Sequence, residues 1–245
     1  MGLRINTNVA AINASRTLRG STTSLNKSLE RLSSGLRINR AADDAAGLAI
    51  AEGFRSLVKG AAVAQRNAQD GISLVQTAEG ALSETTNILQ RIRELAVQSS
   101  NGTVSTTNRQ ALQAEVTQLI AQIDDISTDT EFNGIRVLSV NQTVTLQAGA
   151  QASQTLAITM NGARAADLAV SALAISSATM ATSSISTVDL ALRSVSSLRS
   201  TLGAFQNRLE FTINTLAIQE ENSAASESAI RDANIAQETI AFTRN

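Results

Sequence analysis

The side chains best able to do chemistry gather in one stretch, residues 32–50, which reads LSSGLRINRAADDAAGLAI. The adjacent Asp43 and Asp44 could be a pair of metal ligands, because carboxylate oxygens suit hard cations. Adjacent aspartates that open a helix are more often capping residues, which accept backbone N–H bonds and complement the helix dipole. Gly35 lies where a glycine would end a helix. We therefore interpret the stretch as a joint, in which Gly35 ends one helix and Asp43 starts the next.

Basic side chains and small residues surround this joint. Arg31, Arg37 and Arg40 lie within reach of the two aspartates, or of acids on a neighbouring chain. Gly47 and Gly53 would permit close packing of the helix that follows.

The composition excludes most catalytic centres. The 245 residues contain no His, Cys, Trp, Tyr or Pro. Without imidazole and thiol groups, Ser–His–Asp triads, thiol nucleophiles, zinc fingers and haem ligation cannot be built. Because only Ser, Lys, Arg and carboxylates remain, we expect no enzymatic activity, no metal and no cofactor.

The charge pattern argues against two classes of partner. The net charge is −1, and acids and bases are interspersed, whereas nucleic-acid binding needs a basic patch. No apolar run approaches the ~18 residues of a membrane span. The N-terminal residues lack the continuous apolar core of a secretory signal. We expect no nucleic-acid partner, no membrane partner and no cleaved signal peptide.

Two segments with heptad spacing predict long helices. In the predicted helix over residues 45–99, the first seam is Val75, Leu82, Leu89 and Ala96, and the second is Ala78, Thr85 and Ile92. From residue 188 onward, the first seam is Val188, Val195, Leu202, Leu209 and Leu216, and the second is Ala191, Leu198, Phe205 and Thr212. The absence of proline suits such uninterrupted helices.

Weaker elements flank these two helices. The spacing predicts a polar helix over 5–34, a short one over 106–126, and an amphipathic tail after 216. Asn101–Gly102 and Asn133–Gly134 mark turns. Alternating residues predict a small β-hairpin region, roughly 135–160, and we expect 161–186 to be a linker or a loosely packed segment.

The expected fold is therefore mainly α. It is a long antiparallel helical bundle or coiled coil formed by the N- and C-terminal halves, with a small β-hairpin region in the middle. We expect terminal helices at 1–44 and 229–245, a heptad rod from 45–138 and 187–228, and a short variable insert at 139–186. The weak helical patterns at both ends of the chain favour an assembly partner, although a free-standing bundle remains an alternative.

Several separate blocks of the chain resemble bacterial flagellin. They include INTNVAAINASRTL, SLERLSSGLRINRAADDAAGLAIAEG, NAQDGISLVQTAEGALSETTNILQRIRELAVQ, EFNGIRVL and LGAFQNRLEFTINTLAIQEENSAASESAIRDANIA, in family order. The resemblance implies a structural subunit that polymerises into the flagellar filament for motility. A hook–filament junction protein of the same superfamily and a monomeric helical binding module are the alternatives.

The resemblance also implies where subunits meet. Terminal helices would form an inner tube and heptad helices the next layer, and the short insert would leave no large outer domain. The implied assembly residues are Ile5, Val9, Ile12, Leu29, Leu32, Arg31, Asn39, Asp43, Asp44, Ile230 and Ile240. The family usually continues beyond IAFTRN, so we expect that the chain is shortened or has an unusual end.

Partners and location follow from the same resemblance. The expected partners are further copies of the chain, the flagellar export apparatus, a flagellin chaperone, the filament cap and the hook–filament junction proteins. The expected location is extracellular, in the flagellum, reached without a cleaved signal peptide. LQRIRELAVQ resembles the surface that an animal innate flagellin receptor recognises, which points to Arg91, Leu95, Glu115 and the neighbouring Gln90. Arg91 and Glu115 could equally be ordinary salt-bridge residues.

Overall fold

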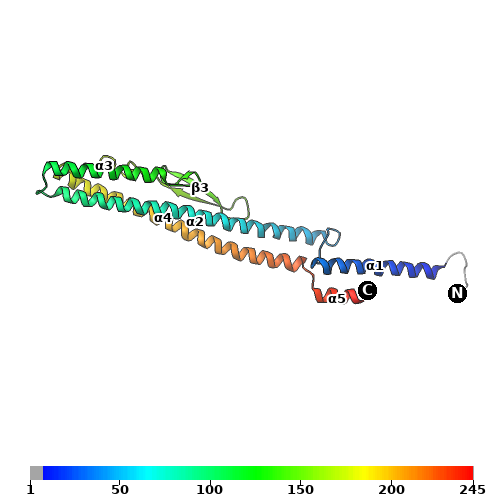
Figure 1. Cartoon of the computed structure of the whole chain (residues 1–245). Coiled ribbons are helices and arrows are strands. Elements are labelled where there is room, and N and C mark those ends of the chain that lie inside the picture. Colours follow the sequence, from blue (N-terminus) through cyan, green and yellow to red (C-terminus); the bar gives the residue numbers. More distant parts are fainter. Residues whose placement is uncertain (1–7, 245) are drawn as a thin grey trace. The chain divides into compact units, whose positions relative to one another are not determined.

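The computed structural model describes residues 8–244, so Ile5 lies outside the described part. Its helices are α1 (Val9–Ser34), α2 (Ala45–Ser100), α3 (Thr106–Asp129), α4 (Ala178–Arg231) and α5 (Ile235–Arg244). Its strands are β1 (Glu131–Phe132), β2 (Ile135–Arg136), β3 (Gln142–Gln147) and β4 (Thr155–Met160) (Figure 1). Long helices dominate and α2 and α4 pack antiparallel, which confirms the predicted fold class.

The chain divides into two compact units. One comprises the residues up to Ala61 together with those from Ile218 onward, and the other is Ala62–Ala217. One division falls inside α2 and the other inside α4.

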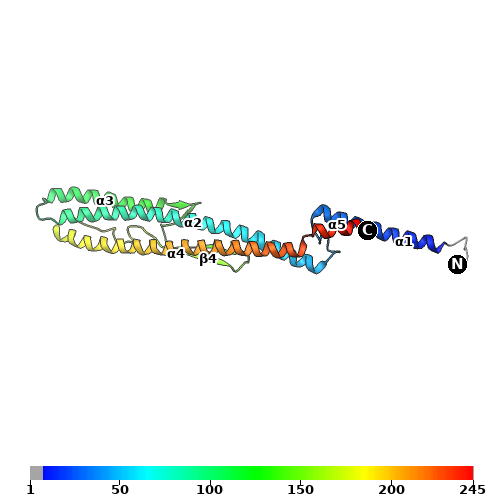
Figure 2. The same cartoon turned by 90° about the horizontal axis from the view of Figure 1, so that it is seen from below.

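The heptad seams form the core of the second unit. Val75, Leu82 and Leu89 on α2 are fully buried, as are Val195 and Leu209 on α4. Two ion pairs between α2 and α4 agree with the antiparallel order of these helices. Arg93 Nε lies 2.8 Å from Asp189 Oδ1, and Arg199 Nη2 lies 3.4 Å from Glu79 Oε1. In both views, α2 and α4 run side by side through this unit, and α3 lies along them (Figures 1 and 2).

Two antiparallel hairpins follow α3. β1 and β2 enclose Asn133–Gly134, both with positive φ, as a two-residue hairpin turn requires. β3 pairs with β4 from Gln142↔Met160 to Gln147↔Thr155. Alternate β4 residues Leu156, Ile158 and Met160 are buried, so one face of this hairpin covers the helices.

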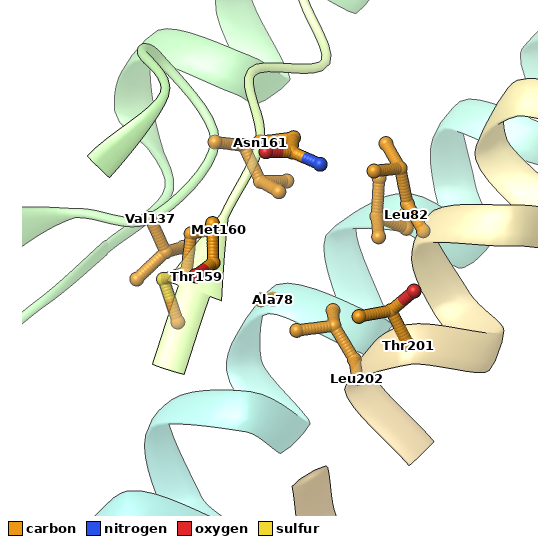
Figure 3. Close-up of a pocket in the computed structure, with 10 residues that line it drawn as sticks. Ala78, Leu82, Val137, Thr159, Met160, Asn161, Thr201 and Leu202 are labelled. Atoms are coloured by element: carbon orange, nitrogen blue, oxygen red, sulfur yellow. The ribbon is translucent and has the colours of Figure 1, made fainter. Parts of the chain in front are cut away.

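The hairpin packs closely on the helices. A Cβ added to Gly71 on α2 would lie 2.3 Å from Leu146 Cδ1, so glycine leaves the space that β3 fills. Figure 3 shows Met160 of β4 and Val137, which follows β2, opposite Leu82 of α2 and Leu202 of α4. The cavity left among these residues measures about 10 Å³, which is the size of one water molecule.

The expectation of a loosely packed linker over 161–186 is wrong. α4 already begins at Ala178, and Val170 and Ile175 are fully buried. Side chains of the helices bond the backbone before α4: Gln113 Nε2 donates to Leu173 O at 3.2 Å, and Ser184 Oγ donates to Ala174 O at 2.9 Å. Residues 161–177 are therefore a strap without regular secondary structure, held by side chains of α3 and α4.

Candidate subunit-assembly site

The joint predicted from the sequence spans residues 35–44, between α1 and α2. Gly35 ends α1 in the left-handed conformation, with φ 73°, and its N–H donates to Arg31 O at 2.8 Å. Any side chain would be strained at this φ, so the prediction that glycine ends the helix is confirmed.

Asp44, rather than Asp43, caps α2. Asp44 Oδ1 accepts the N–H of Gly47 at 2.8 Å, and Asp44 O accepts the N–H of Leu48 at 3.0 Å. A Cβ on Gly47 would lie 2.4 Å from Asp44 Oδ2, so glycine is required for the cap to close. Nothing in the described part of the chain lies within 4 Å of a Cβ added at Gly53, so no other described element packs closely there.

Asp43 closes the turn that precedes the cap. Its Oδ2 accepts the backbone N–H groups of Asn39 and Arg40 at 3.3 and 3.2 Å, and its Oδ1 lies 2.7 Å from Lys27 Nζ. The hydrogen bond from Lys27 and then that from the Arg40 N–H lower the pKa of Asp43 to about 2. The carboxylate thus ties the turn to α1.

The arginines of the joint do not bind the two aspartates through their guanidinium groups. Arg40 Nε donates to Glu30 Oε1 at 2.8 Å, and Asn39 Nδ2 donates to the same oxygen at 2.8 Å. Arg31 Nη1 lies 3.6 Å from Glu238 Oε1 of α5, which links the two terminal helices. The expected pairing of these arginines with the aspartates within the chain is therefore wrong.

The joint also pairs with the chain that leaves α4. Arg37 N donates to Arg231 O at 2.7 Å, and Ala233 N donates to Gly35 O at 2.9 Å. Leu36 and Asp232 form an isolated antiparallel bridge. The carbonyl of Arg231 accepts the N–H of Arg37, and Nη1 of its side chain lies 3.1 Å from Glu52 Oε1 of α2. Hydrogen bonds thus join the connection between α1 and α2 to the connection between α4 and α5.

Sequence reasoning missed Lys27, which supplies the cation that pairs with Asp43 in the joint.

Two Ser–Lys pairs have a spacing that some Ser–Lys hydrolases share. Ser24 precedes Lys27 by three residues, and Ser56 precedes Lys59 by three residues. All four side chains are exposed on helices. Enzyme sites are usually concave, so these positions do not resemble a catalytic pocket.

The terminal helices leave apolar side chains in solvent. Ile12 on α1 is 61% exposed and Ile240 on α5 is 67% exposed. Val9 and Leu29 are also exposed, while Leu32 and Ile230 are half-buried. α1 and α5 contact each other, yet this pairing leaves much of their apolar surface uncovered. Such surface usually marks an interaction site.

A second predicted site lies on α2 and α3. Arg91 Nε and Nη2 donate to Glu115 Oε1 at 3.0 and 2.9 Å, and Arg91 Nη1 donates to Glu94 Oε2 at 3.1 Å. Glu115 and then Glu94 raise the pKa of Arg91 through these bonds. Gln90 is exposed beside them, whereas Leu95 is 1% exposed and packs in the core. The exposed part of the site is therefore polar.

Two further features of the described residues concern metal ions and membranes. Residues 8–244 contain no group of three or more acids placed to hold a metal ion. None of the helices in this range combines the length and the apolar character needed to cross a membrane.

Long packed helices, together with terminal helices that expose apolar side chains, are typical of a structural protein that works in an assembly. The model of the bacterial flagellin N-terminal helical region matches residues 5–143, and that of the C-terminal helical region matches residues 185–245. The chain belongs to the bacterial flagellin family.

Individual relatives agree with this assignment. A flagellin of Halalkalibacterium halodurans is 49% identical, over 98% of this chain and 89% of its own length. A flagellin of Bacillus subtilis is 44% identical, over 99% of this chain and 91% of its own length. The crystal structure of Bacillus cereus flagellin is 31% identical, with a TM-score of 0.54, over 62% of this chain and 88% of that one. The chain is a flagellar filament subunit, and neither the junction protein nor the monomeric module is favoured.

Proposed function

We propose that subunits contact one another through the joint and through the exposed faces of α1 and α5. The supporting observation is the solvent exposure of Val9, Ile12, Leu29 and Ile240. Burial of one such aliphatic side chain is worth about 1.5–3 kcal/mol, so four of them can contribute much to assembly. In this proposal the terminal helices form the inner layer, the heptad rod the next one, and the short insert adds no large outer domain.

The joint is proposed to set the geometry of these contacts. Asn39 and Asp43 fasten the turn to α1, and Asp44 caps α2. Arg31 links α1 to α5. Arg31, Leu32 and Ile230 are partly buried within the chain, so we assign them a positioning role as well as contact with a neighbour.

A double substitution tests the role of the joint. Asp43→Ala with Asp44→Ala should impair seeded filament growth because the turn and the cap are lost together. The α2–α4 core should keep its circular dichroism and thermal melting, since both residues lie outside Ala62–Ala217. Asp70→Ala, at an exposed acid of α2, is the matched control. Filament growth at the rate of the unmodified chain would contradict the proposal.

Export and location are part of the same proposal. We infer that the chain passes through the flagellar export apparatus with a flagellin chaperone, without a cleaved signal peptide. Outside the cell, it would add to the filament between the hook–filament junction and the cap. We also propose that it has no enzymatic activity, which the absence of His and Cys supports.

Recognition by an animal innate receptor is a second proposed role, suggested by the resemblance. The exposed Arg91, Gln90 and Glu115 would contact the receptor, while the buried Leu95 would hold α2 in place. An arginine with a planar guanidinium suits an interface anchor. In the bacterium, Arg91 and Glu115 would simply join α2 to α3.

A further inference from the structure

We propose that Asn101 is a self-modification site, at which Asn101–Gly102 cyclises and loses ammonia while the chain is folded. The chain has three Asn–Gly pairs in its described part, at 101–102, 133–134 and 161–162. Glycine favours this reaction because it has no Cβ to obstruct its backbone nitrogen. The three pairs differ in their surroundings, and only the first has both polar groups that the reaction needs.

Arg109 can activate the nucleophile. In the turn after α2, Arg109 Nη2 donates to Asn101 O at 3.0 Å, while its Nε donates to Ser99 O at 2.9 Å. The carbonyl of Asn101 and the N–H of Gly102 belong to one peptide group. When this N–H loses its proton, negative charge spreads to the carbonyl oxygen, where the guanidinium stabilises it.

Thr103 can stabilise the other charge that develops. The backbone N–H of Thr103 donates to Asn101 Oδ1 at 3.2 Å. This oxygen becomes negative when the Gly102 nitrogen attacks Cγ of Asn101, so the N–H acts as an oxyanion donor. Asn101 and Gly102 are exposed, and the side of Gly102 is open, with nothing within 4 Å of an added Cβ. Water therefore reaches the site.

The chemistry needs water alone. The Gly102 nitrogen bonds to Cγ of Asn101 and gives up its proton, the Cγ–Nδ2 bond breaks, and Nδ2 leaves as ammonia. Water then opens the resulting five-membered imide, its hydroxyl adding to one ring carbonyl and its proton returning to the nitrogen. Opening at Cγ gives aspartate, and opening at the main-chain carbonyl gives isoaspartate. Either product adds one negative charge near Arg109.

The other two pairs lack this arrangement. Asn133–Gly134 is held in a two-residue turn with both φ positive, between the paired Phe132 and Ile135. The nitrogen of Gly162 already donates to Asn141 Oδ1 at 2.8 Å, and Gly162 is buried. Moving this nitrogen toward the Asn161 side chain would break that bond.

The test is a time course of the full chain at neutral pH, with peptide mapping by mass spectrometry and isoaspartate methyltransferase labelling. Asn101 should convert first. Arg109→Met should slow this conversion about tenfold, which corresponds to an activation barrier about 1.4 kcal/mol higher. Gly102→Ala should nearly abolish it while leaving the fold intact, since the added methyl meets open space. Thermal melting checks that each variant is folded.

The unfolded chain provides the internal control. In denaturant the preference for Asn101 and the effect of Arg109→Met should both disappear. Thr103→Pro, which removes the oxyanion donor, gives a second test if Arg109→Met unfolds. The proposal is overturned if Asn133 or Asn161 converts as fast as Asn101 in the folded chain, or if a folded Arg109→Met converts at the unmodified rate.

Discussion

Asp43 and Asp44 have the same side chain but different tasks. Asp44 bonds Gly47 N–H and starts α2, while Asp43 bonds two N–H groups of the preceding turn and pairs with Lys27 of α1. The sequence predicts that Asp43 starts the helix, and this choice between the two neighbours is wrong because Asp44 caps it. That choice depends on the path of residues 39–42, which brings N–H groups to Asp43.

The Asp43 interactions predict an acid-sensitive turn. Its pKa is lowered from 3.8 to about 2, so the folded state favours the carboxylate. The stabilisation is fully present above the unfolded pKa, near 4, and is lost as the pH falls through about 2. Carboxyl-carbon NMR should show Asp43 titrating near pH 2, and Asp43→Asn should remove the pH dependence of hydrogen exchange in the turn. Titration of Asp43 near pH 4 in the folded protein would contradict this assignment.

Arg91 gives a prediction about receptor recognition. Arg91→Asp should weaken receptor activation by the soluble monomer about thirtyfold, as the loss of an interface anchor worth ~2 kcal/mol would. Arg66→Asp, at an exposed arginine on the same helix, is the matched control. Dose–response curves in receptor-expressing cells measure both variants. Equal activation by Arg91→Asp and the unmodified monomer would remove Arg91 from the proposed site.

At the scale of elements, heptad spacing predicted the buried seams of the two long helices, because such a pattern is local in the sequence. The first-seam residues Val75, Leu82 and Leu89 are buried, and so is Leu209 on the antiparallel partner. The strap could not be predicted in the same way. Its irregular backbone is stabilised by side chains outside the segment, such as Gln113, which is 60 residues from Leu173, and Ser184 on the helix that follows. No local pattern in residues 161–177 predicts these bonds.

Gly71 and Gly80 of α2 allow a matched test of hairpin docking. Gly71→Val should cost about 1–3 kcal/mol, because the side chain would overlap Leu146 of β3 and crowd Leu209 of α4. Gly80 meets nothing within 4 Å, so Gly80→Val should change stability by no more than about 0.5 kcal/mol. Urea unfolding of the two monomers measures the difference. Equal unfolding midpoints would mean that the hairpin does not depend on the space at Gly71.

At the scale of the whole molecule, the chain has one well-packed core and one region with little core of its own. Between Ala62 and Ala217, fully buried residues come from helices, hairpin and strap alike. In contrast, no residue of α5 is buried, and Ser28 is the only buried residue of α1 in the described part of the chain. In the proposed assembly, the terminal helices would therefore obtain most of their apolar burial from neighbouring subunits.

The critical concentration for seeded filament growth tests this account most directly. Ile12→Ser and Ile240→Ser change side chains that are mostly exposed in the monomer, so monomer stability should stay within about 0.5 kcal/mol. If these side chains are buried between subunits, each substitution should raise the critical concentration about ten- to a hundredfold, as a loss of ~1.5–3 kcal/mol predicts. Folded variants that elongate seeds at the critical concentration of the unmodified chain would contradict the claim that these faces hold the filament together.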